Sequence, residues 1–483
     1  MASRFERFLL PIGCVATALS AITWWFGSSL HPVWWLTWVA PLPVLMLAPR
    51  VRTRWALLAA CGAYVLGSFN LWDYLHNYIK LPPPIVVYII GMPGIMLAIC
   101  VWLFRRLLLR GRVLAASLAL PAFWVALEYV NTMTSPHGTF GSIAYTQMEA
   151  LAVIQVAAVG GIWAISFLLL LVPAILAVQT WQAATCRSRK GAAALGAVLL
   201  VATIAYGISR LQAPATGTIR VGLVSLEKPI RPAVDDAKGK DLLDRYVQAI
   251  GKLADDGAQA VLIPETSFAT KEATIPALAE LATQRKLILG AGIDLKDGAG
   301  PEHNMLTVFH PGAQSPATYS KHHLIPGFEQ QYAPGSSYAQ LAGSPRIGLA
   351  ICKDMDFQDI GVAYAALRTQ LLLVPAWDFT ADGWLHGRMA ILRGVEGGFA
   401  IARAARTGRL TLSDDRGRVV AEASSEQHDA TLVGNLPLYE SRTLYGRWGD
   451  WFAWLDLVIL AACLGMSFMP ARNTAAIPTA SAG

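Results

Sequence analysis

Long runs of apolar residues, separated by short polar segments, fill the first 210 residues of the chain and return once near its C-terminus. A helix that crosses a bilayer needs about 20 mostly apolar residues. The pattern therefore predicts a membrane domain over residues 1–210, with about seven transmembrane helices, and a C-terminal transmembrane helix over 451–470. The seven expected spans lie at 8–26, 31–48, 54–74, 85–104, 113–131, 151–178 and 191–208.

Between these two membrane parts, residues 217–445 have the composition of a soluble domain, and short apolar strand patterns alternate with helical patterns. Such alternation is typical of an α/β domain in which helices cover a sheet. The expected strands are 218–225, 260–266, 286–292, 304–310, 347–352, 370–375, 398–405 and 430–435. The expected helices are 240–255, 274–285, 358–369 and 384–396.

The composition and charge agree with a membrane protein. Of the 483 residues, 54% are hydrophobic and 15% are charged, whereas soluble domains have about 25% charged residues. The net charge is +7, but the basic residues lie in short loops between apolar runs, which is typical of membrane topology rather than of nucleic-acid binding. The basic loops follow the second, fourth and sixth spans: Arg50, Arg52 and Arg54; Arg105, Arg106, Arg110 and Arg112; Arg187, Arg189 and Lys190.

Loops rich in arginine and lysine stay in the cytoplasm. We therefore expect a cytoplasmic N-terminus and place residues 217–445 on the opposite, extracytoplasmic side. The small polar tail at 471–483 is expected to be disordered. Glu128, at the end of the fifth span, is either an interfacial residue or part of a substrate path, because a carboxylate at that depth is costly unless it is paired or hydrated.

Cys352 is the only one of the six cysteines that falls within 217–445. An unpaired thiol in an oxidising compartment is a candidate reactive group, although a free cysteine is also a common core residue. Cys352 follows the apolar run 346–351 and precedes a polar turn and a helical pattern. A thiol at such a strand-to-helix turn is exposed at the edge of a sheet, near backbone amides that can hold an oxyanion.

Two other strand ends offer partners for this thiol. Glu265 follows the apolar strand pattern at 260–266, and Lys321 ends a further apolar segment. A buried carboxylate can take the proton of a thiol nucleophile, and an ammonium group can stabilise an oxyanion. Taken singly, each is more often a solvated strand end or a surface charge. The neighbouring His322 and His323 point to opposite faces of a strand, so a metal site is not expected.

The ordered residues Pro264-Glu265, Tyr319-Ser320-Lys321 and Ile351-Cys352 resemble the Glu-Lys-Cys triad of the carbon–nitrogen hydrolase (nitrilase) superfamily. The similarity continues at Asn304, His386, Arg393-Gly394-Val395-Glu396 and Arg403-Ala404-Ala405-Arg406-Thr407-Gly408. Seven spans before such a domain and one after it resemble the apolipoprotein N-acyltransferase family over essentially the whole chain. The resemblance implies a nitrilase-like αββα sandwich on the periplasmic side of a bacterial inner membrane.

The resemblance further implies a ping-pong acyl transfer without a metal or another cofactor. Cys352 would take an acyl chain from a phospholipid as a thioester, with Glu265 as the general base and Lys321 as the oxyanion stabiliser. Glu329 would support this triad, and Asp354, at the position of a family glutamate, is a second candidate supporting residue. The acyl chain would then pass to the amino group of a lipoprotein N-terminal cysteine or a related amine.

The chain departs from the family pattern at positions that would face a substrate. These are Ser225-Leu226-Glu227, the loop around Gly138, Pro326-Gly327-Phe328, Lys353 and Val374-Pro375-Ala376 before Trp377. Only residues 330–344 follow Glu329, where the family has a long apolar lid. A short lid admits water, so a membrane-anchored amidase that acts on a small amide is the alternative function. A transporter or scaffold with an inactive domain is disfavoured by the complete triad and by the few ionisable residues in the spans.

Overall fold

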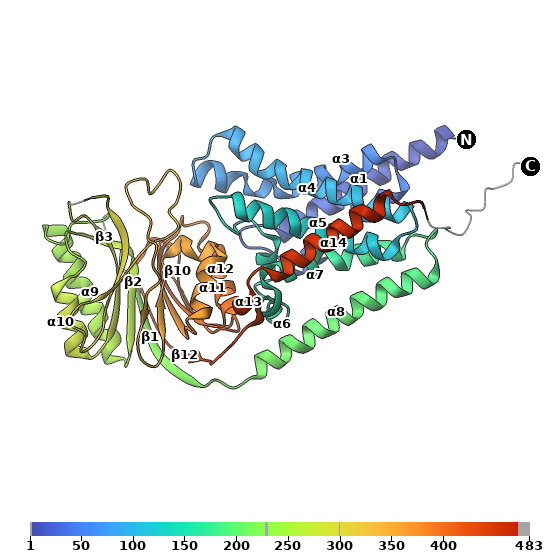
Figure 1. Ribbon diagram of the computed structural model, residues 1–483. Helices are drawn as coiled ribbons and strands as arrows, with labels where there is room; N and C mark the ends of the chain where they lie inside the picture. Colours follow the sequence, from blue (N-terminus) through green and yellow to red (C-terminus); the bar gives the residue numbers. More distant parts are fainter. Residues whose placement is uncertain (1, 228–229, 299, 472–483) are drawn as a thin grey trace, which may run out of the picture.

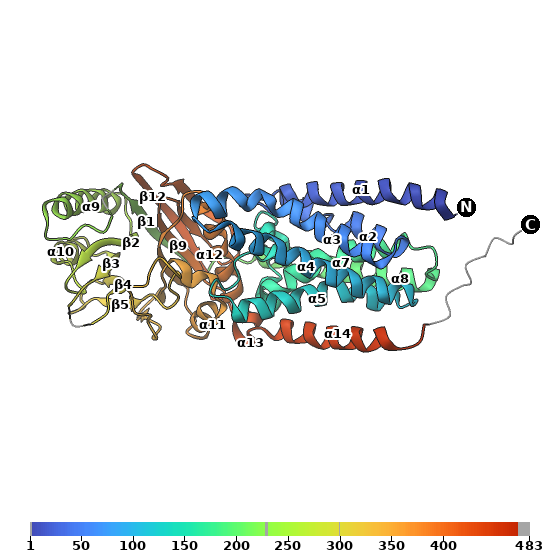
Figure 2. The same ribbon diagram turned by 90° about the horizontal axis from the view of Figure 1, so that it is seen from above.

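The computed structural model describes residues 2–227, 230–298 and 300–471. Helices gather at one end of an elongated molecule, and an α/β domain forms the other end (Figure 1). Seen from above, the long helices run side by side along the axis of the molecule (Figure 2). The first helix, α1 (Ala2–Gly27), begins and the last helix, α14 (Trp451–Phe468), ends at the end remote from the α/β domain. The tail predicted to be disordered, 471–483, lies outside the described residues except for its first residue.

Most of the predicted spans are single helices. These are α1 (Ala2–Gly27), α3 (Thr53–Ser68), α4 (Pro83–Leu109), α5 (Val113–Thr134), α7 (Ala157–Gln179), α8 (Cys186–Gln212) and α14 (Trp451–Phe468). Within the described part of the chain, five of them are long and apolar enough to cross a membrane: α4, α5, α7, α8 and α14. Helix α1 covers the span predicted at 8–26.

The span expected at 31–48 is wrong as a single helix. The segment consists of three short pieces: η1 (Trp34–Trp38), α2 (Leu42–Leu47) and η2 (Ala48–Arg50). Prolines at positions 41, 43 and 49 cause the breaks, because proline has no N–H to donate to the preceding turn. The segment still connects the two ends of the helical bundle, since Trp38 Nε1 donates to Gln147 Oε1 at 2.7 Å and an Arg50 guanidinium nitrogen donates to Thr180 O at 2.7 Å.

The span expected at 54–74 is also shorter than predicted. Helix α3 ends at Ser68, and a 3-10 turn, η3 (Phe69–Leu71), and one turn of π-helix, η4 (Tyr74–Tyr78), follow it. The polar side chain of Asn70 leaves the helix to donate to Trp25 O. The prediction therefore treated α3 and the following loop, which leads towards the α/β domain, as one membrane span.

The segment 151–178 forms two helices, α6 (Leu151–Ile154) and α7, and α7 itself is broken at Gly161. Gly161 has φ +67°, and a Cβ there would overlap the ring of Tyr445, so only glycine fits. The break frees the amide of Ile162, which donates to Glu396 Oε1 at 2.7 Å. A carboxylate from the α/β domain thus caps the N-terminal end of the second half of α7.

The α/β domain contains two six-stranded sheets packed face to face. The first has the order β12-β1-β2-β3-β4-β5, and the second has the order β11-β10-β9-β8-β7-β6. The strands of the first sheet are β1 (Gly217–Ser225), β2 (Ala260–Thr270), β3 (Ile288–Leu295), β4 (His303–Phe309), β5 (Ala317–Ser320) and β12 (Ala430–Leu438). Those of the second are β6 (Gln340–Leu341), β7 (Ile347–Leu349), β8 (Leu371–Trp377), β9 (Ala400–Arg406), β10 (Arg409–Ser413) and β11 (Val419–Ser424).

Helices cover the outer face of each sheet. Helices α9 (Ala237–Asp255) and α10 (Pro276–Arg285) pack on the first sheet, and α11 (Gln358–Ala366) and α12 (Gly383–Gly397) pack on the second. Alternate residues of both sheets, such as Leu262 and Leu373, fill the core between them. The predicted αββα sandwich is therefore confirmed. The expected strands did not include β6, β10 and β11, which are short or, like β11, lack buried residues.

The loops of the helical bundle hold the second sheet and its helices. Tyr74 OH donates to Asp382 Oδ2 at 2.6 Å, and the amide of Thr139 donates to Asp356 O at 2.9 Å. Glu128 Oε1 accepts a hydrogen bond from the Ile143 amide at 3.2 Å, so this carboxylate holds the loop that carries Thr139. The two domains are therefore joined through buried polar contacts close to the ends of β7 and β8.

Candidate active site

The three residues proposed as a triad all lie at one edge of the sandwich. Glu265 lies in β2, Lys321 directly follows β5, and Cys352 begins the 3-10 turn η6 (Cys352–Asp356) after β7. Strands β2 and β7 lie in different sheets, and the two sheets face each other across the core. The topology therefore brings together the Glu265 carboxylate from within a strand and an ammonium group and a thiol from two strand ends, all far apart in sequence.

A buried ion cluster surrounds the ammonium group of Lys321. Its Nζ lies 2.8 Å from Glu265 Oε1 and 2.9 Å from Glu329 Oε2. Asn304 Nδ2 donates to the same two carboxylates, at 2.6 Å to Glu265 and 2.8 Å to Glu329. Glu329 Oε2 also accepts a hydrogen bond from the Ile325 amide at 2.7 Å. Lys321 is 1% exposed, so the cluster works in a medium of low dielectric constant, where charges interact strongly.

The backbone is unusual at Cys352 and at the residue after Glu265. Cys352 has φ +44° and Thr266, next to Glu265, also has φ +44°. Non-glycine residues rarely adopt this left-handed region, and such strain collects at functional sites. In β2 the register with β3 shifts between Ile263 and Phe268, so the strand bulges where it carries Glu265. The bulge and the turn at Cys352 direct both side chains away from a regular strand.

The thiol of Cys352 lies beside this cluster. Its Sγ donates to the carbonyl oxygen of Trp377, at the end of the neighbouring strand β8, at 3.8 Å. Burial raises the pKa of Cys352 well above its ordinary value, and the charge of Glu265 acts in the same direction, while Lys321 and Arg403 lower it. The group is therefore a thiol at neutral pH, and it needs a base before it can act as a nucleophile.

The charges of Lys321 and Glu265 suit an oxyanion stabiliser and a general base. Burial acts to lower the pKa of Lys321, but Glu265, Cys352 and Glu329 together raise it well above its ordinary value. Burial also raises the pKa of Glu265, against the opposing effect of Lys321. Lys321 therefore remains a cation at neutral pH, and Glu265 is a carboxylate whose affinity for a proton is increased, as a general base requires.

Asp354 is a positioning residue that does not touch the triad. Its Oδ2 accepts from Tyr319 OH at 2.8 Å and from the Ile351 amide at 2.9 Å. Its Oδ1 accepts from the amides of His322 and His323 at 3.1 Å and 2.9 Å. Asp354 thus ties the residues around Lys321 to the residue before Cys352 and fixes the two strand ends relative to each other.

Sequence reasoning placed His322 and His323 on a strand, and the structure corrects this. Both lie in a bend after β5, because the strand ends at Ser320. The ring of His323 stacks on Phe357 with centroids 3.6 Å apart. The ring of His322 stacks on Tyr319 at 4.9 Å. Both rings therefore pack against aromatic neighbours.

Two further residues near the thiol were not predicted as site residues. Arg403, on β9, forms two hydrogen bonds to the Asp378 carboxylate, and both side chains are buried. The positive charge of Arg403 lowers the pKa of Cys352. The sequence held a signal, because Arg403 is a charged residue inside an otherwise apolar strand and a buried charge requires a partner.

One group of side chains could offer ligands to a metal ion. Asp378, Asp382 and His386 place one ligand atom each within 4.8 Å of one another. These atoms already have protein partners: Arg403 binds Asp378, and Tyr74 and His386 contact Asp382. The pKa of Asp382 is lowered to about 2, since the charge of His386 outweighs the effect of burial, and the pKa of His386 is raised to about 9 by Asp382. The pair is therefore an ion pair at neutral pH, which is already charge-balanced.

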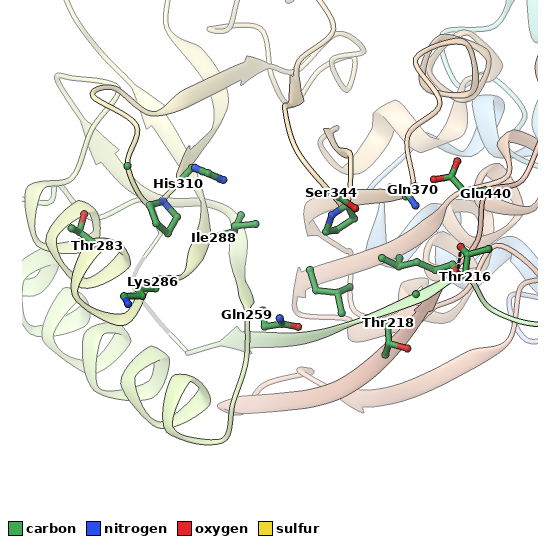
Figure 3. Close-up of a pocket in the computed structure, with 16 residues that line it drawn as sticks. Thr216, Thr218, Gln259, Thr283, Lys286, Ile288, His310, Ser344, Gln370 and Glu440 are labelled. Carbon is green, nitrogen blue, oxygen red and sulfur yellow. Dashed lines mark hydrogen bonds between the residues drawn. The ribbon is translucent and has the colours of Figure 1, made fainter.

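A hollow in the α/β domain lies at the opposite edge of the sandwich. It measures about 980 Å³ and is lined by residues at the beginnings of β1, β2, β3, β7 and β8, as Figure 3 shows for Thr218, Gln259, Ile288 and Gln370. The triad lies at or after the C-terminal ends of the parallel strands. The hollow therefore plays no direct part in chemistry at Cys352.

Comparison with known proteins assigns both halves of the chain. A family model described as the apolipoprotein N-acyltransferase N-terminal domain matches residues 20–175, and a carbon-nitrogen hydrolase model matches residues 221–444. The chain belongs to the apolipoprotein N-acyltransferase family. It is 26% identical to the apolipoprotein N-acyltransferase of Geobacter metallireducens, over 90% of this chain and 91% of that protein. It is 27% identical to that of Gloeobacter violaceus, over 91% of each.

The family makes the chain a membrane-bound N-acyltransferase with a nitrilase-like domain. Among solved structures, an amidase from Nesterenkonia sp. is similar to it, with 23% identity, a TM-score of 0.38, and coverage of 45% of this chain and 90% of the amidase. The acyltransferase relatives match both the membrane domain and the α/β domain.

We predict that Glu265→Gln separates the action of Glu265 as a base from the effect of its charge on the pKa of Cys352. Without the base, acyl transfer should slow by about 10²- to 10⁴-fold. The substitution also removes a charge that raises the pKa of Cys352 and leaves Lys321 in place, so the thiol should ionise at lower pH. The rate of Cys352 alkylation by iodoacetamide, followed by intact mass over a pH series, should show a midpoint below that of the wild type.

A matched control is Glu302→Gln. Glu302 is half-buried and pairs with Lys296 at 3.0 Å, away from Lys321. This variant should change neither acyl transfer nor the alkylation midpoint. A midpoint that stays in place or rises in Glu265→Gln would contradict the charges assigned to the cluster.

Proposed function

We propose that Cys352 carries an acyl group from a membrane phospholipid to an amine as a thioester. The observation that carries the proposal is the buried Lys321 ammonium, held 2.8 Å from Glu265 Oε1 beside the Cys352 thiol. A base, a cation and a nucleophile lie within one cluster, and they are the groups that acyl transfer requires. The membrane domain supports a lipid donor, because the substrate would reach the site from the bilayer.

In the first half-reaction the thiol attacks the ester carbonyl of the donor. Glu265 takes the proton of Cys352 as the S–C bond forms, and Lys321 stabilises the oxyanion of the tetrahedral intermediate. The C–O ester bond then breaks. Glu265 returns its proton to the departing alkoxide, so the lysolipid leaves as an alcohol and the acyl group remains on Cys352 as a thioester.

In the second half-reaction an amine attacks the thioester. Glu265 takes a proton from the attacking nitrogen as the N–C bond forms, Lys321 again stabilises the oxyanion, and the C–S bond breaks. The thiolate of Cys352 recovers the proton from Glu265, which restores the resting enzyme. The names of the relatives support the N-terminal cysteine of a lipoprotein, or a related amine, as the acceptor.

We assign supporting roles to Glu329 and Asp354. Glu329 shares Lys321 and Asn304 with Glu265, so it keeps the ammonium group in place when Glu265 becomes protonated. Asp354 holds the nucleophile turn against the Lys321 segment through four hydrogen bonds. Neither residue needs to contact a substrate.

We predict that incubation of the detergent-purified protein with a defined phospholipid produces an acyl adduct on Cys352. Intact mass spectrometry should show one added acyl chain that hydroxylamine removes, because thioesters are cleaved by this reagent. A Cys352→Ala variant should show no adduct, and a Cys186→Ala variant, which changes another exposed cysteine, should behave as the wild type. The absence of an adduct with any phospholipid, from folded and reduced protein, would contradict the proposal and favour the amidase alternative.

We further propose that the α/β domain lies on the periplasmic side of the bacterial inner membrane. The support is the alternation of basic segments between the spans, with Arg187, Arg189 and Lys190 at the N-terminal end of α8. In single-cysteine chains in spheroplasts, a membrane-impermeant maleimide should label Lys252→Cys, on the exposed face of α9. It should label Cys186 only after the membrane is permeabilised. The reverse pattern would place the domain in the cytoplasm.

A further inference from the structure

Two arginine side chains pack on one indole ring next to the triad. The guanidinium carbon of Arg406 lies 4.4 Å from the ring centroid of Trp377, and that of Arg231 lies 5.7 Å from it. Arg231 also lies 5.3 Å from the ring of Tyr332. The aromatic rings hold the long arginine side chains in place, so the two cations are fixed near each other before any ligand arrives.

The arginine pair lies at the same edge of the second sheet as the candidate nucleophile. Cys352, Trp377 and Arg406 end or follow the parallel strands β7, β8 and β9, which are neighbours in this order. Trp377 is the direct register partner of Arg406, and its carbonyl accepts from Cys352 Sγ at 3.8 Å. Neighbouring strands are about 4.8 Å apart, so Arg406 stands about two strand spacings from Cys352, within the reach of its side chain.

The two guanidinium groups lie close enough for their charges to interact. Burial lowers the pKa of Arg406, and the nearby charge of Arg231 also lowers it, against the effects of Tyr246 and Glu227. Two like charges at such a distance are more stable with a bound anion between them. Arg231 Nε is buried and has no hydrogen-bond partner among the described residues.

Three carboxylates lie on the same side of the domain as the pair, and two of them share one cation. Asp294 lies 3.4 Å from Lys296 Nζ, and Lys296 also contacts Glu302 at 3.0 Å. The third is Glu227, which directly precedes the short undescribed segment before Arg231. Trp377, Arg231 and Arg406 are all half-buried rather than covered, so a ligand can contact the pair from solvent.

We infer that Arg231 and Arg406 bind the phosphodiester of the lipid whose ester is cleaved at Cys352. Guanidinium groups bind phosphate oxygens through paired hydrogen bonds, and their planar shape suits this anion better than a lysine does. In a glycerophospholipid the glycerol backbone links the phosphate to the ester. An anchored phosphate therefore restricts where the ester carbonyl can lie relative to the thiol and to Lys321. The inference rests on the proposed function, since it names the part of the donor that this site would recognise.

The test compares two donors that differ in the phosphoglycerol headgroup. Phosphatidylglycerol and diacylglycerol with the same acyl chains are presented in mixed micelles at concentrations below saturation, and formation of the Cys352 adduct is timed by intact mass. The wild type should react about 10- to 100-fold faster with phosphatidylglycerol, because charge-assisted hydrogen bonds to the phosphate are lost with diacylglycerol. Arg231→Gln/Arg406→Gln should lose this preference while its rate with diacylglycerol stays within about twofold of the wild type.

The control variant is Arg220→Gln/Arg285→Gln, which removes the same charge from other parts of the domain. Arg220 bonds Asn435 on β12, and Arg285 pairs with Asp255 on the outer helices, so the preference for phosphatidylglycerol should remain. Inorganic phosphate, added as a competitor, should slow the reaction with phosphatidylglycerol and leave the reaction with diacylglycerol unchanged. Inhibition of both reactions would indicate a site for free phosphate that is not part of donor recognition.

Several results would overturn the inference. These are equal wild-type rates with the two donors, an undiminished preference in Arg231→Gln/Arg406→Gln, or an equal loss with both donors in that variant, which would indicate a structural role. Each of them leaves the proposed function intact, because the wild type still forms the adduct. Failure of the proposed function is a different result, namely no adduct on the wild type with either lipid.

Discussion

The structure depends on one constraint: a lysine ammonium buried between the sheets must be neutralised where it lies. Lys321 has two carboxylates, Glu265 and Glu329, and Asn304 holds both of them. A buried charge left without its partner typically costs about 3–5 kcal/mol, so the strand ends that carry these residues cannot shift independently. The same cluster sets the charge state of the thiol. Burial and Glu265 keep Cys352 protonated until a substrate is present, which protects it from unwanted reactions.

The membrane domain contributes to this arrangement through its loops. Thr139 holds the end of the nucleophile turn through Asp356, and Tyr74 holds the segment after β8 through Asp382. The carboxylate of Glu396 caps the broken helix α7 in return. The α/β domain is therefore tied to the bundle on the side where its catalytic edge lies. The proposed function requires this coupling, because the donor would come from the bilayer and the proposed nucleophile, Cys352, lies in the α/β domain.

The sequence pattern alone predicted an α/β domain in which helices cover a sheet, and the αββα architecture was implied by the family resemblance. The positions of Lys321 and Cys352 at strand ends were predicted because apolar strands followed by polar residues are local signals, whereas Glu265 lies within β2, at its bulge. The hydropathy of residues 31–48 alone predicted a single helix. The prolines around position 41 break that segment into shorter pieces. Other features could not be predicted. The left-handed backbone at Cys352 and the four bonds of Asp354 arise from contacts between segments distant in sequence, and no local pattern encodes them.

The central claim, that the Cys352 thioester passes its acyl group to an amine, is tested most directly by the discharge of the isolated acyl-enzyme. The acylated protein is mixed with a peptide whose N-terminal cysteine carries a diacylglyceryl group, or with the same peptide acetylated at its N-terminus, and both products are followed by mass. The account predicts that the adduct disappears as the free peptide gains one acyl chain, and that the acetylated peptide leaves the adduct in place. Release of free fatty acid at the same rate with both peptides would contradict it and identify water as the acceptor.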